Sequence, residues 1–393
     1  MEKRYTAGSE LAAVVAAVES RMPWMLVRLQ KLVEMETPSS DKAAVDGAAD
    51  VVGVWCEALG GKVKRHAQKA HGDLLEVFFA PVGAKTSTLP KPVMLLGHLD
   101  TVWATGTLAK MPWREDKKKI YGPGVYDMKS GVLMAMTAIA ALQDCNLLHV
   151  PVVLLLVSEE EIGSPVSRPV TEKIARECSA AFVMEPAQGL QGAYKTARKG
   201  IANYELRVKG VASHAGVDFA QGHSAILELM RLLAKVETFT NLKRGLTVNP
   251  GVIGGGTRSN VIAAEAWADV DVRIAKEADA ARVEKMFRGL KCTDKACSLT
   301  VTGGMNRPPM ERKPGTVALF KRAQKIASAI GVELDEAATG GASDGNFTAS
   351  VGTPTLDGMG PVGEGAHAPH ESLVKSSLVE RTVLLAGMIA NIS

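Results

Sequence analysis

Acidic residues and a histidine directly follow several apolar segments of this chain. His98 and Asp100 come after "VMLLG", and alternation along an extended strand puts residues two apart on the same face. Acidic side chains also follow the runs "VVLLLVS" and "AFVM", and one lies in the turn-rich segment "YGPGVYDMKSG". These further candidates are Asp127, Glu159, Glu160, Glu161 and Glu185. One such residue alone is typical of a solvated loop, but four such segments favour a chemical site.

The candidate ligands are imidazole and carboxylate without thiolate. This donor set suits Zn²⁺, Co²⁺ or Mn²⁺ in a hydrolytic site. Two-metal hydrolases hold their ions about 3.5–4 Å apart, usually with a shared carboxylate. Adjacent carboxylates on an extended backbone point in opposite directions. In the run "EEE", one carboxylate can therefore bind metal while its neighbour reaches a bound water.

The elements that would position these residues alternate between helices and apolar strands. Because near-continuous apolar strands are covered on both faces, the pattern predicts an α/β fold with a mainly parallel sheet between helices. In such sheets, ligands bind at the carboxyl ends of the strands. The expected helices are 10–36, 42–59 and 131–144, and the expected apolar strands are 74–81, 93–97, 152–157 and 181–184.

The pattern changes near residue 200. Segments 204–210 and 264–274 alternate strictly between apolar and polar residues, which is typical of antiparallel strands with one solvated face. With helices near 223–240 and 277–290, they predict a small inserted α+β domain at 200–305. Helical periodicity returns at 315–330 and 375–391, around a glycine-rich loop region at 339–367. The catalytic domain is therefore expected to be discontinuous, comprising 1–199 and 306–393.

Composition excludes several other classes of protein. The 393 residues carry 46 basic and 42 acidic side chains, too close to balance to favour nucleic-acid binding. The five scattered cysteines contain no CxxC motif and predict neither a disulfide framework nor a thiolate zinc site. The N-terminal apolar run reads as an amphipathic helix, and the longest apolar stretches fall short of the roughly 20 residues of a membrane span. We expect a cytoplasmic protein without a membrane partner.

Six motifs in order carry a family resemblance. They are "GHLDTV", "GPGVYDMKSG", "SEEEIGS", "MEP", "ASHAG" and "GAHAPHES". Together they resemble the zinc-dependent family of aminoacylases, succinyl-diaminopimelate desuccinylase and glutamate carboxypeptidase, over nearly the whole chain. "HLDTVW" resembles the glutamate carboxypeptidase (carboxypeptidase G) branch most closely. The resemblance implies a di-zinc exopeptidase-like fold with an inserted lid and dimerisation domain.

The resemblance also implies roles for individual residues. Two Zn²⁺ ions per subunit would be bridged by Asp127, with Co²⁺ or Mn²⁺ as alternatives. One ion would be completed by His98 and Glu185, and the other by Glu160 and His367; His370 competes for the last position, but the spacing of "GAH" to Glu371 favours His367. Glu159 would be the general base, and Asp100 would hold His98 through its other ring nitrogen.

The inserted domain would supply the remaining groups. His214 matches a histidine that reaches the partner subunit's site and stabilises the oxyanion, so the resemblance implies a homodimer. Asn260, Arg273 and Arg307 match positions that bind the carboxylate end of the substrate. One departure is Ala193, which occupies the place of a substrate-binding lysine common in the branch, with Lys195 nearby.

These features predict a metal-dependent hydrolase that releases a C-terminal, acidic amino acid from a peptide or N-acyl conjugate. The alternative is an N-acyl amino acid deacylase of the acetylornithine or succinyl-diaminopimelate type. A non-catalytic, peptide-binding relative is disfavoured, because such proteins lose a ligand or the base. "GASDG" formally matches the GxSxG elbow with Ser343 as nucleophile, but it lacks the preceding buried strand that this motif requires.

Overall fold

The computed structural model describes residues 8–81 and 89–392, so residues 1–7 of the predicted N-terminal helical segment lie outside the described residues. The chain divides into two compact units. Unit 1 comprises Met1–Ala197, Arg312–Thr339 and Ser343–Ser393, and unit 2 comprises Arg198–Glu311 and Gly340–Ala342. The sequence predicts an insertion at 200–305, within the long continuous segment of unit 2.

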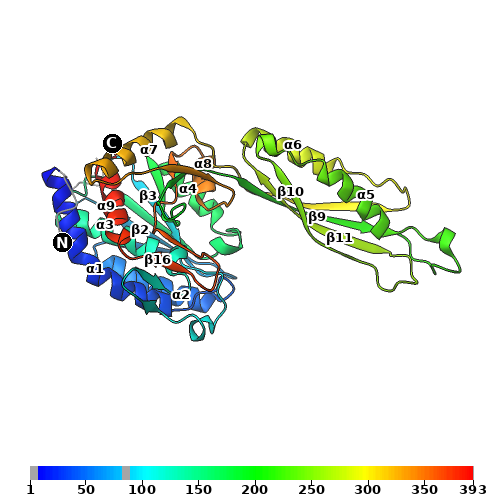
Figure 1. Ribbon diagram of the computed structural model, residues 1–393, viewed down its shortest axis with the longest axis horizontal. Coiled ribbons are helices and arrows are strands. Elements are labelled where there is room, and N and C mark those ends of the chain that lie inside the picture. The colour runs from blue at the N-terminus through cyan, green and yellow to red at the C-terminus, as the bar shows by residue number, and fades with distance from the viewer. Residues whose placement is uncertain (1–7, 82–88, 393) are drawn as a thin grey trace. The chain divides into compact units, whose positions relative to one another are not determined.

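Unit 1 is built on a six-stranded sheet (Figure 1). Its strands, in spatial order, are β1 (Lys62–His66), β2 (Leu74–Phe79), β6 (Val152–Val157), β3 (Val93–His98), β7 (Ala180–Val183) and β14 (Thr355–Leu356). The four strands from β6 to β14 run parallel, while β1 and β2 are antiparallel to their neighbours. The predicted α/β fold with a mainly parallel sheet is confirmed.

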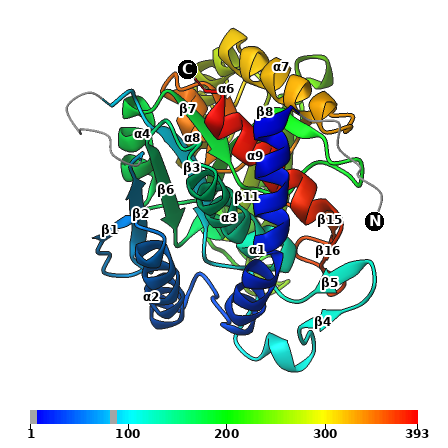
Figure 2. The ribbon, with the colours of Figure 1, turned by 90° about the vertical axis from the view of Figure 1, so that its left-hand side faces the viewer.

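Helices cover both faces of this sheet, which explains why its central strands are apolar throughout. In β3, Val93 and Leu95 enter the larger core, whereas Met94 and Leu96 enter the core on the opposite face. The larger core is closed by α1 (Ser9–Glu34), α2 (Lys42–Ala58), α3 (Ser130–Asp144), α7 (Pro314–Ala329) and α9 (Ser377–Ala390) (Figure 2). The opposite face is covered by α4 (Arg168–Glu177), which packs against α8 (Gly345–Ser350).

The segment that contains α3 is unusually apolar. Within the described part of the chain, Val125–Asp144 is the one helical segment long and apolar enough to cross a membrane, but 94% of it is buried inside the protein. It packs between the sheet, α1 and α9. Its composition is therefore that of a central core helix.

Short elements complete unit 1. A four-stranded sheet is formed by β15 (Gly363–Glu364), β16 (Ser372–Val374), β5 (Lys119–Tyr121) and β4 (Arg114–Glu115), and β8 (Tyr194–Arg198) pairs with β13 (Glu336–Thr339). The region 339–367, expected as a loop, contains α8, β14 and β15. Single 3-10 turns occur at Thr107–Ala109, Glu160–Ile162, Phe219–Gln221 and Leu242–Arg244.

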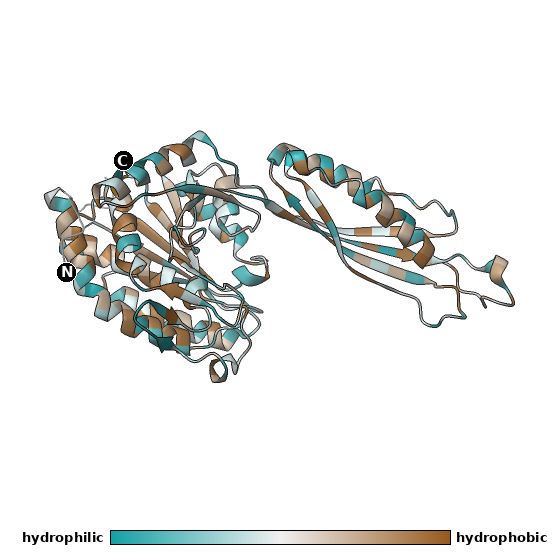
Figure 3. Ribbon diagram, in the orientation of Figure 1, coloured by the Kyte–Doolittle hydropathy of each residue, from teal (hydrophilic) through white to brown (hydrophobic). Residues whose placement is uncertain are grey.

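Unit 2 is a four-stranded antiparallel sheet with two helices on one face (Figure 3). Its strands, in spatial order, are β10 (Thr247–Gly255), β11 (Glu265–Ile274), β9 (Gly200–Lys209) and β12 (Ser298–Arg307), and its helices are α5 (Ala225–Glu237) and α6 (Glu277–Arg288). Every second residue of β9 and β11 is buried against the helices. This is the alternation that the sequence predicts for a sheet with one solvated face.

Candidate metal centre

Three neighbouring parallel strands of unit 1 end at the same edge of the sheet. In the strand register, His98 at the end of β3 lies opposite Val157 at the end of β6, and Leu96 lies opposite Val183 at the end of β7. The polar residues that follow these strands therefore start from adjacent positions. This is the edge at which open α/β sheets bind ligands.

His98 is buried and presents one ring nitrogen to carboxylates. Its Nδ1 donates to the Asp100 carbonyl oxygen at 2.9 Å, which leaves Nε2 as the nitrogen with a lone pair. Nε2 lies 3.4 Å from Asp127 Oδ1 and 3.7 Å from Glu185 Oε1, and it has no hydrogen-bond partner among the described residues. A lone pair facing two carboxylates calls for a cation between them.

Asp127 joins this arrangement to a second histidine. Its Oδ2 lies 3.5 Å from Nε2 of His367, and Oε2 of Glu161 lies 3.1 Å from the same nitrogen. His367, rather than His370, makes these contacts. The two oxygens of Asp127 thus face two different imidazoles, as expected of a carboxylate that bridges two ions.

The spacing of these atoms fits metal coordination. Ligands of a tetrahedral zinc ion with bonds of 2.0–2.2 Å lie about 3.3–3.6 Å from one another. The four contacts above are 3.1–3.7 Å long. Oε1 of Glu161, like Nε2 of His98, is buried without a hydrogen-bond partner in the part of the chain described. Two groups of three potential ligands converge here: His98, Asp127 and Glu161, and His98, Glu160 and Glu185.

The electrostatics of the site follow from this crowding. Burial raises the pKa of Asp127, but the nearby imidazoles of His367 and His98 outweigh it and hold that pKa well below its usual range. The carboxylates of Asp127 and Glu161 raise the pKa of His367 to about 10. Burial lowers the pKa of His98, yet Asp100 and Asp127 together raise it well above its ordinary value. The carboxylates thus favour positive charge at both histidines.

Glu159, the residue predicted as general base, is held inside its own loop. Its side chain is fully buried, and both carboxylate oxygens accept hydrogen bonds from its own loop. Oε1 accepts from the backbone amides of Val166 and Ser167, and Oε2 accepts from the amide and hydroxyl of Ser158. Glu159 is not a member of either group of converging candidate ligands. Likewise, Glu161 rather than the predicted Glu160 contacts His367.

The backbone explains why the contact to His367 comes from Glu161, one residue later than predicted. The extended conformation ends at Glu159, and Glu160–Ile162 form a 3-10 turn closed by Gly163 at a φ of 94°. Side chains in such a turn are spread around its axis, so the strict alternation assumed for "EEE" does not apply. Glycine often ends a helical turn in the left-handed conformation. Gly163, three positions after Glu160, could therefore have indicated that a turn, rather than extended backbone, carries Glu160 and Glu161.

Asp100 acts on more than His98. Its Oδ1 lies 3.4 Å from Nδ1 of His98, but the shorter contact of that ring nitrogen is to the Asp100 backbone carbonyl. The carboxylate accepts from the Ser39 hydroxyl at 2.6 Å and from the amides of Glu160 and Glu161 at 3.2 Å. Asp100 therefore connects the end of β3 to the turn that carries two candidate site residues.

Glu371 is a functional residue whose role the sequence did not reveal. Its buried carboxylate accepts hydrogen bonds from the amides of Gly124, Tyr126 and Asp127 at 2.9–3.1 Å, and so holds the loop that presents the Asp127 side chain. His367, four positions earlier, has a φ of 61°, which is uncommon for a residue other than glycine. The "GAHAPHES" segment thus both presents a candidate ligand and fixes another.

The predicted residues of unit 2 form two separate pairs. His214 and Asn260 are close together, because the amide of Ala215 donates to the Asn260 carbonyl and His214 bridges to Val261. Arg273 and Arg307 instead both lie opposite Ile201, on the two strands that flank β9. The pairs occupy opposite ends of the sheet.

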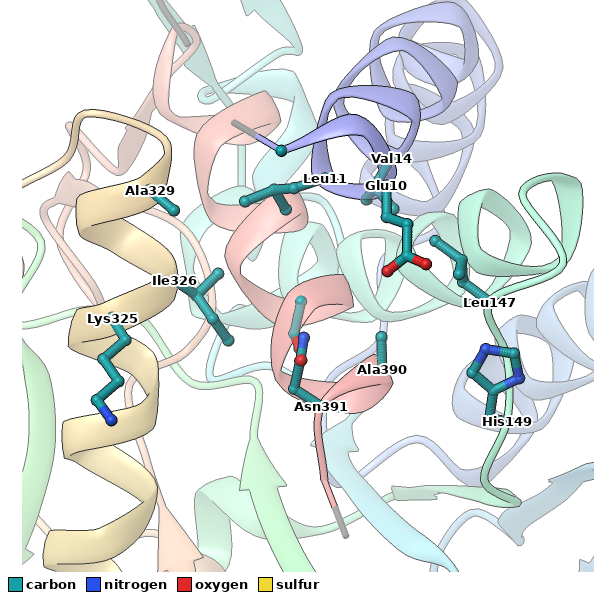
Figure 4. Close-up of a pocket in the computed structure, with 12 residues that line it drawn as sticks. Glu10, Leu11, Val14, Leu147, His149, Lys325, Ile326, Ala329, Ala390 and Asn391 are labelled. Carbon is teal, nitrogen blue, oxygen red and sulfur yellow. The ribbon is translucent and has the colours of Figure 1, made fainter. Parts of the chain in front are cut away.

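Two other features carry no comparable chemistry. A pocket of about 450 Å³ between α1, α7 and α9 is lined by Glu10, His149, Lys325 and apolar side chains, with none of the predicted site residues (Figure 4). Ser343, the formal GxSxG nucleophile, is fully buried, and its hydroxyl donates to Asp357 at 2.6 Å. The arrangement of Ser343 is that of a structural hydrogen bond at the start of α8.

Comparisons with known proteins agree with this site. The chain is 28% identical over 396 residues to carboxypeptidase G2 of Pseudomonas sp. (strain RS-16), covering 98% of this chain and 94% of that relative. Its fold is similar to aminopeptidase PepT from Bacillus cereus ATCC 10987, with a TM-score of 0.74, 20% identity and coverage of 93% and 97%. It is also similar to the M20 family metallo-carboxypeptidase Sso-CP2 from Sulfolobus solfataricus, with a TM-score of 0.71, 18% identity and coverage of 93% and 98%.

Residues 94–391, well over half of the chain, match Peptidase family M20/M25/M40. This segment contains the three converging strand ends, the Asp127 loop, the "EEE" turn and the "GAHAPHES" segment. The predicted family resemblance is confirmed. The chain belongs to Peptidase family M20/M25/M40 and is a hydrolase that acts on peptide bonds.

Proposed function

We propose that the protein is a two-zinc exopeptidase that releases a C-terminal amino acid from a peptide or N-acyl conjugate. The observation that carries this proposal is the position of Asp127 between two histidines, each with its own carboxylate. One ion would be held by His98, Glu185 and Asp127, and the other by His367, Glu161 and Asp127. Three protein ligands for each ion leave positions open for water and substrate, as catalytic zinc sites require.

Glu160 is the group best placed to act as general base. It is the third member of the group formed by His98 and Glu185, yet neither ion needs it to complete a set of three ligands. Bound zinc would polarise the scissile carbonyl and make water more acidic. Glu160 would take the proton from the attacking water and pass it to the leaving nitrogen, a transfer typically worth about 10²–10⁴-fold in rate.

His214 suits the stabilisation of negative charge on the substrate. Its Nδ1 accepts hydrogen bonds from the amides of Gly216 and Val217, both at 3.1 Å. In the neutral ring the proton therefore resides on Nε2, which becomes a donor. The side chain is exposed, so this donor is available to the oxyanion that develops when water attacks the carbonyl.

The geometry of unit 2 favours a homodimer with shared sites. β9 runs from Gly200 to Lys209 between the two predicted pairs, and eight residue steps of strand span about 27 Å. One small substrate cannot contact both pairs in a single copy. We infer that Arg273 and Arg307 bind the substrate carboxylate in one subunit, while His214 and Asn260 of the partner copy complete the same site.

The surface of unit 2 is compatible with such an assembly. Several apolar side chains are exposed on and before α5, and β10 is an edge strand with exposed Val252 and Ile253. The exposed residues near α5 are Val217, Phe219, Ile226, Leu227 and Met230. Exposed apolar patches and unpaired strand edges are typical of surfaces that bind another chain.

The substrate class rests on two opposing observations. Similarity to carboxypeptidase G2 over 98% of the chain supports release of a C-terminal residue, and the resemblance of "HLDTVW" to the glutamate carboxypeptidase branch implies an acidic one. Ala193, however, is 2% exposed and its backbone pairs with Gln188, so this position offers no cation to a substrate side chain. The second observation favours the alternative, an N-acyl amino acid deacylase with the same metal centre.

Hydrolysis of N-acyl-glutamate and of N-acetylornithine by the purified protein, before and after chelation, tests these proposals. Greater activity on N-acyl-glutamate, lost on chelation and restored by Zn²⁺, is expected. Preference for N-acetylornithine would establish the deacylase alternative. Activity that survives complete metal removal would contradict both.

Mixing two inactive variants tests the shared site. Random dimers of Glu160→Gln and His214→Ala chains should recover about a quarter of wild-type activity, because half the dimers are mixed and each has one intact site. Leu227→Asp should yield monomers that bind metal but turn over poorly. Without recovery in mixed dimers, His214 would act within its own subunit or not at all.

A further inference from the structure

The loop that joins β6 to α4 carries both Glu160 and Glu161. We call residues 158–167 the carboxylate loop. Its backbone turns sharply after β6, since Gly163 has a φ of 94° and Ser164 a φ of 55°. Two successive left-handed residues, one of them not glycine, persist only where the surroundings fix them.

Glu159 fixes this loop from inside. Its two oxygens accept from residues at both ends of the loop: Ser158 at the beginning, and Val166 and Ser167 at the end, at 2.6–3.2 Å. The loop is thereby wrapped around one fully buried carboxylate. An ionised carboxylate accepts hydrogen bonds and donates none. All four hydrogen bonds of Glu159 within the loop are accepted by its two oxygens.

Asp344 fixes the same loop from outside. The hydroxyl of Ser164 donates to Asp344 Oδ1, and both side chains are buried, at 1% and 3% exposure. Asp344 belongs to the "GASDG" segment at the start of α8, for which the proposed reaction has no other use. Its contact is made at the left-handed residue that ends the turn containing Glu160 and Glu161.

We propose that Glu159 and Asp344 are positioning residues that set the direction of Glu160 and Glu161 toward the two ions. This inference rests on the proposed function of the site. Neither residue belongs to the two groups of candidate ligands. The carboxylate loop would otherwise have several conformations, and binding of an ion through Glu161 would have to select one of them.

Comparison of Glu159→Gln with Glu159→Ala and Glu160→Gln separates a positioning role from a catalytic one. Glutamine at 159 keeps one oxygen for Val166 and Ser167, and its amide can donate to the Ser158 hydroxyl, which in turn can donate to the Gly72 carbonyl. Only the 3.2 Å hydrogen bond from the Ser158 amide is lost. Glu159→Gln should therefore retain activity within about tenfold. Glu159→Ala should lose about 10–100-fold in metal affinity, the usual effect of removing a group that orients a ligand.

The readouts are metal affinity by titration calorimetry and the visible absorption of the Co²⁺-substituted protein, alongside turnover. Glu160→Gln should bind two ions with a wild-type spectrum and yet be inactive. If Glu159→Gln were as inactive as Glu160→Gln while keeping both ions, Glu159 would be the base. If Glu159→Ala kept wild-type affinity and spectrum, it would have no positioning role.

Asp344 is tested through its partner. Ser164→Ala and Asp344→Asn should each weaken binding of the second ion, and the double variant should lose less than the product of the two single effects. Strictly multiplicative losses would show that the two residues act independently and would overturn the assignment. Glu172→Gln on α4, which breaks an ion pair with Arg168, is the matched control and should change neither affinity nor spectrum.

Metal binding by the wild-type protein distinguishes failure of the proposed function from failure of the positioning roles of Glu159 and Asp344. A wild-type protein that binds no metal would refute the proposed function itself. A wild-type protein that binds two ions, with unaltered Glu159→Ala and Asp344→Asn variants, would refute only the positioning roles.

Discussion

Trp103 donates from its indole Nε1 to Oε2 of Glu371 at 2.8 Å, across 268 positions of sequence. The same carboxylate holds the backbone of the Asp127 loop. Trp103 follows β3, which ends at His98, so this hydrogen bond connects the segments around two candidate ligands. The aromatic residue of "HLDTVW" therefore stabilises the segments that carry candidate ligands.

Replacement of Trp103 by phenylalanine should destabilise the protein by about 1.5–3 kcal/mol, the usual contribution of a hydrogen bond to a charged group. Urea unfolding of the metal-free protein measures this change. Trp113→Phe is the control, because Trp113 packs against the core and no hydrogen bond of its indole occurs among the described residues. Equal destabilisation of both variants would show that ring volume, not the contact with Glu371, matters.

The two neighbouring glutamates of the turn should respond differently to amidation. Glu160→Gln should lower kcat by about 10²–10⁴-fold, because it removes proton transfer, while both ions remain bound. Glu161→Gln should lower affinity for the ion beside His367 by more than the roughly 10–100-fold lost when an orienting group is removed. Metal content by mass spectrometry, together with initial rates, distinguishes them. Loss of an ion from Glu160→Gln would make Glu160 a ligand.

Metal binding should depend on pH through the two histidines. The pKa of His367 is raised to about 10 by Asp127 and Glu161, so the stabilisation that its proton gives the metal-free protein is complete below about 6.5 and is lost as the pH rises through 10. Because an ion must displace this proton, metal affinity should increase over the same window. Calorimetry in buffers of different ionisation enthalpy should detect proton release at pH 7.5; no release would contradict the expectation.

Among the residues that the structure describes, Arg381 is the largest fully buried side chain, and it should be sensitive to substitution. It donates to the carbonyls of Gly192, Gly358 and Gly360 and lies over the ring of Tyr194 at 4.3 Å. Arg381→Met would leave these carbonyls unpaired, at about 1–3 kcal/mol each. We expect a large fall in melting temperature, and Arg282→Met, at an exposed position in α6, serves as the surface control. Unchanged melting of Arg381→Met would mean that water replaces the guanidinium.

The position of the site could be predicted because its strands carry a strong signal. Strands buried on both faces are apolar without interruption, so the first polar residue marks the strand end, as at His98 and Ser158. Because β6 is apolar throughout, its sequence has no alternation between apolar and polar residues. It therefore does not show which face of the sheet the next residue will occupy. The one-residue difference between the glutamate predicted to lie beside His367 and the one found there follows from this.

Elements without such patterns were beyond prediction. β10 contains Pro250 and a register shift, and β14 has only two residues, so neither has a periodicity to detect. The hydrogen bonds from the backbone of the Asp127 loop to the Glu371 carboxylate depend on the pairing of β16 with β5. This pairing is a long-range contact that local sequence does not encode. The motif resemblance identified the types of residue in the candidate site. The hydrogen bonds that orient these residues could be found only in the structure.

The burial of α3 between α1 and α9 has a consequence for biosynthesis. α9 is encoded more than two hundred residues after α3, so a ribosome exposes the apolar α3 long before its cover is synthesised. Most of unit 2 is continuous in sequence and can fold during this interval, as domains generally do. The nascent chain should therefore require a chaperone until α9 emerges, and ribosome stalling before Ser377 should yield an aggregation-prone product with no capacity to bind zinc tightly.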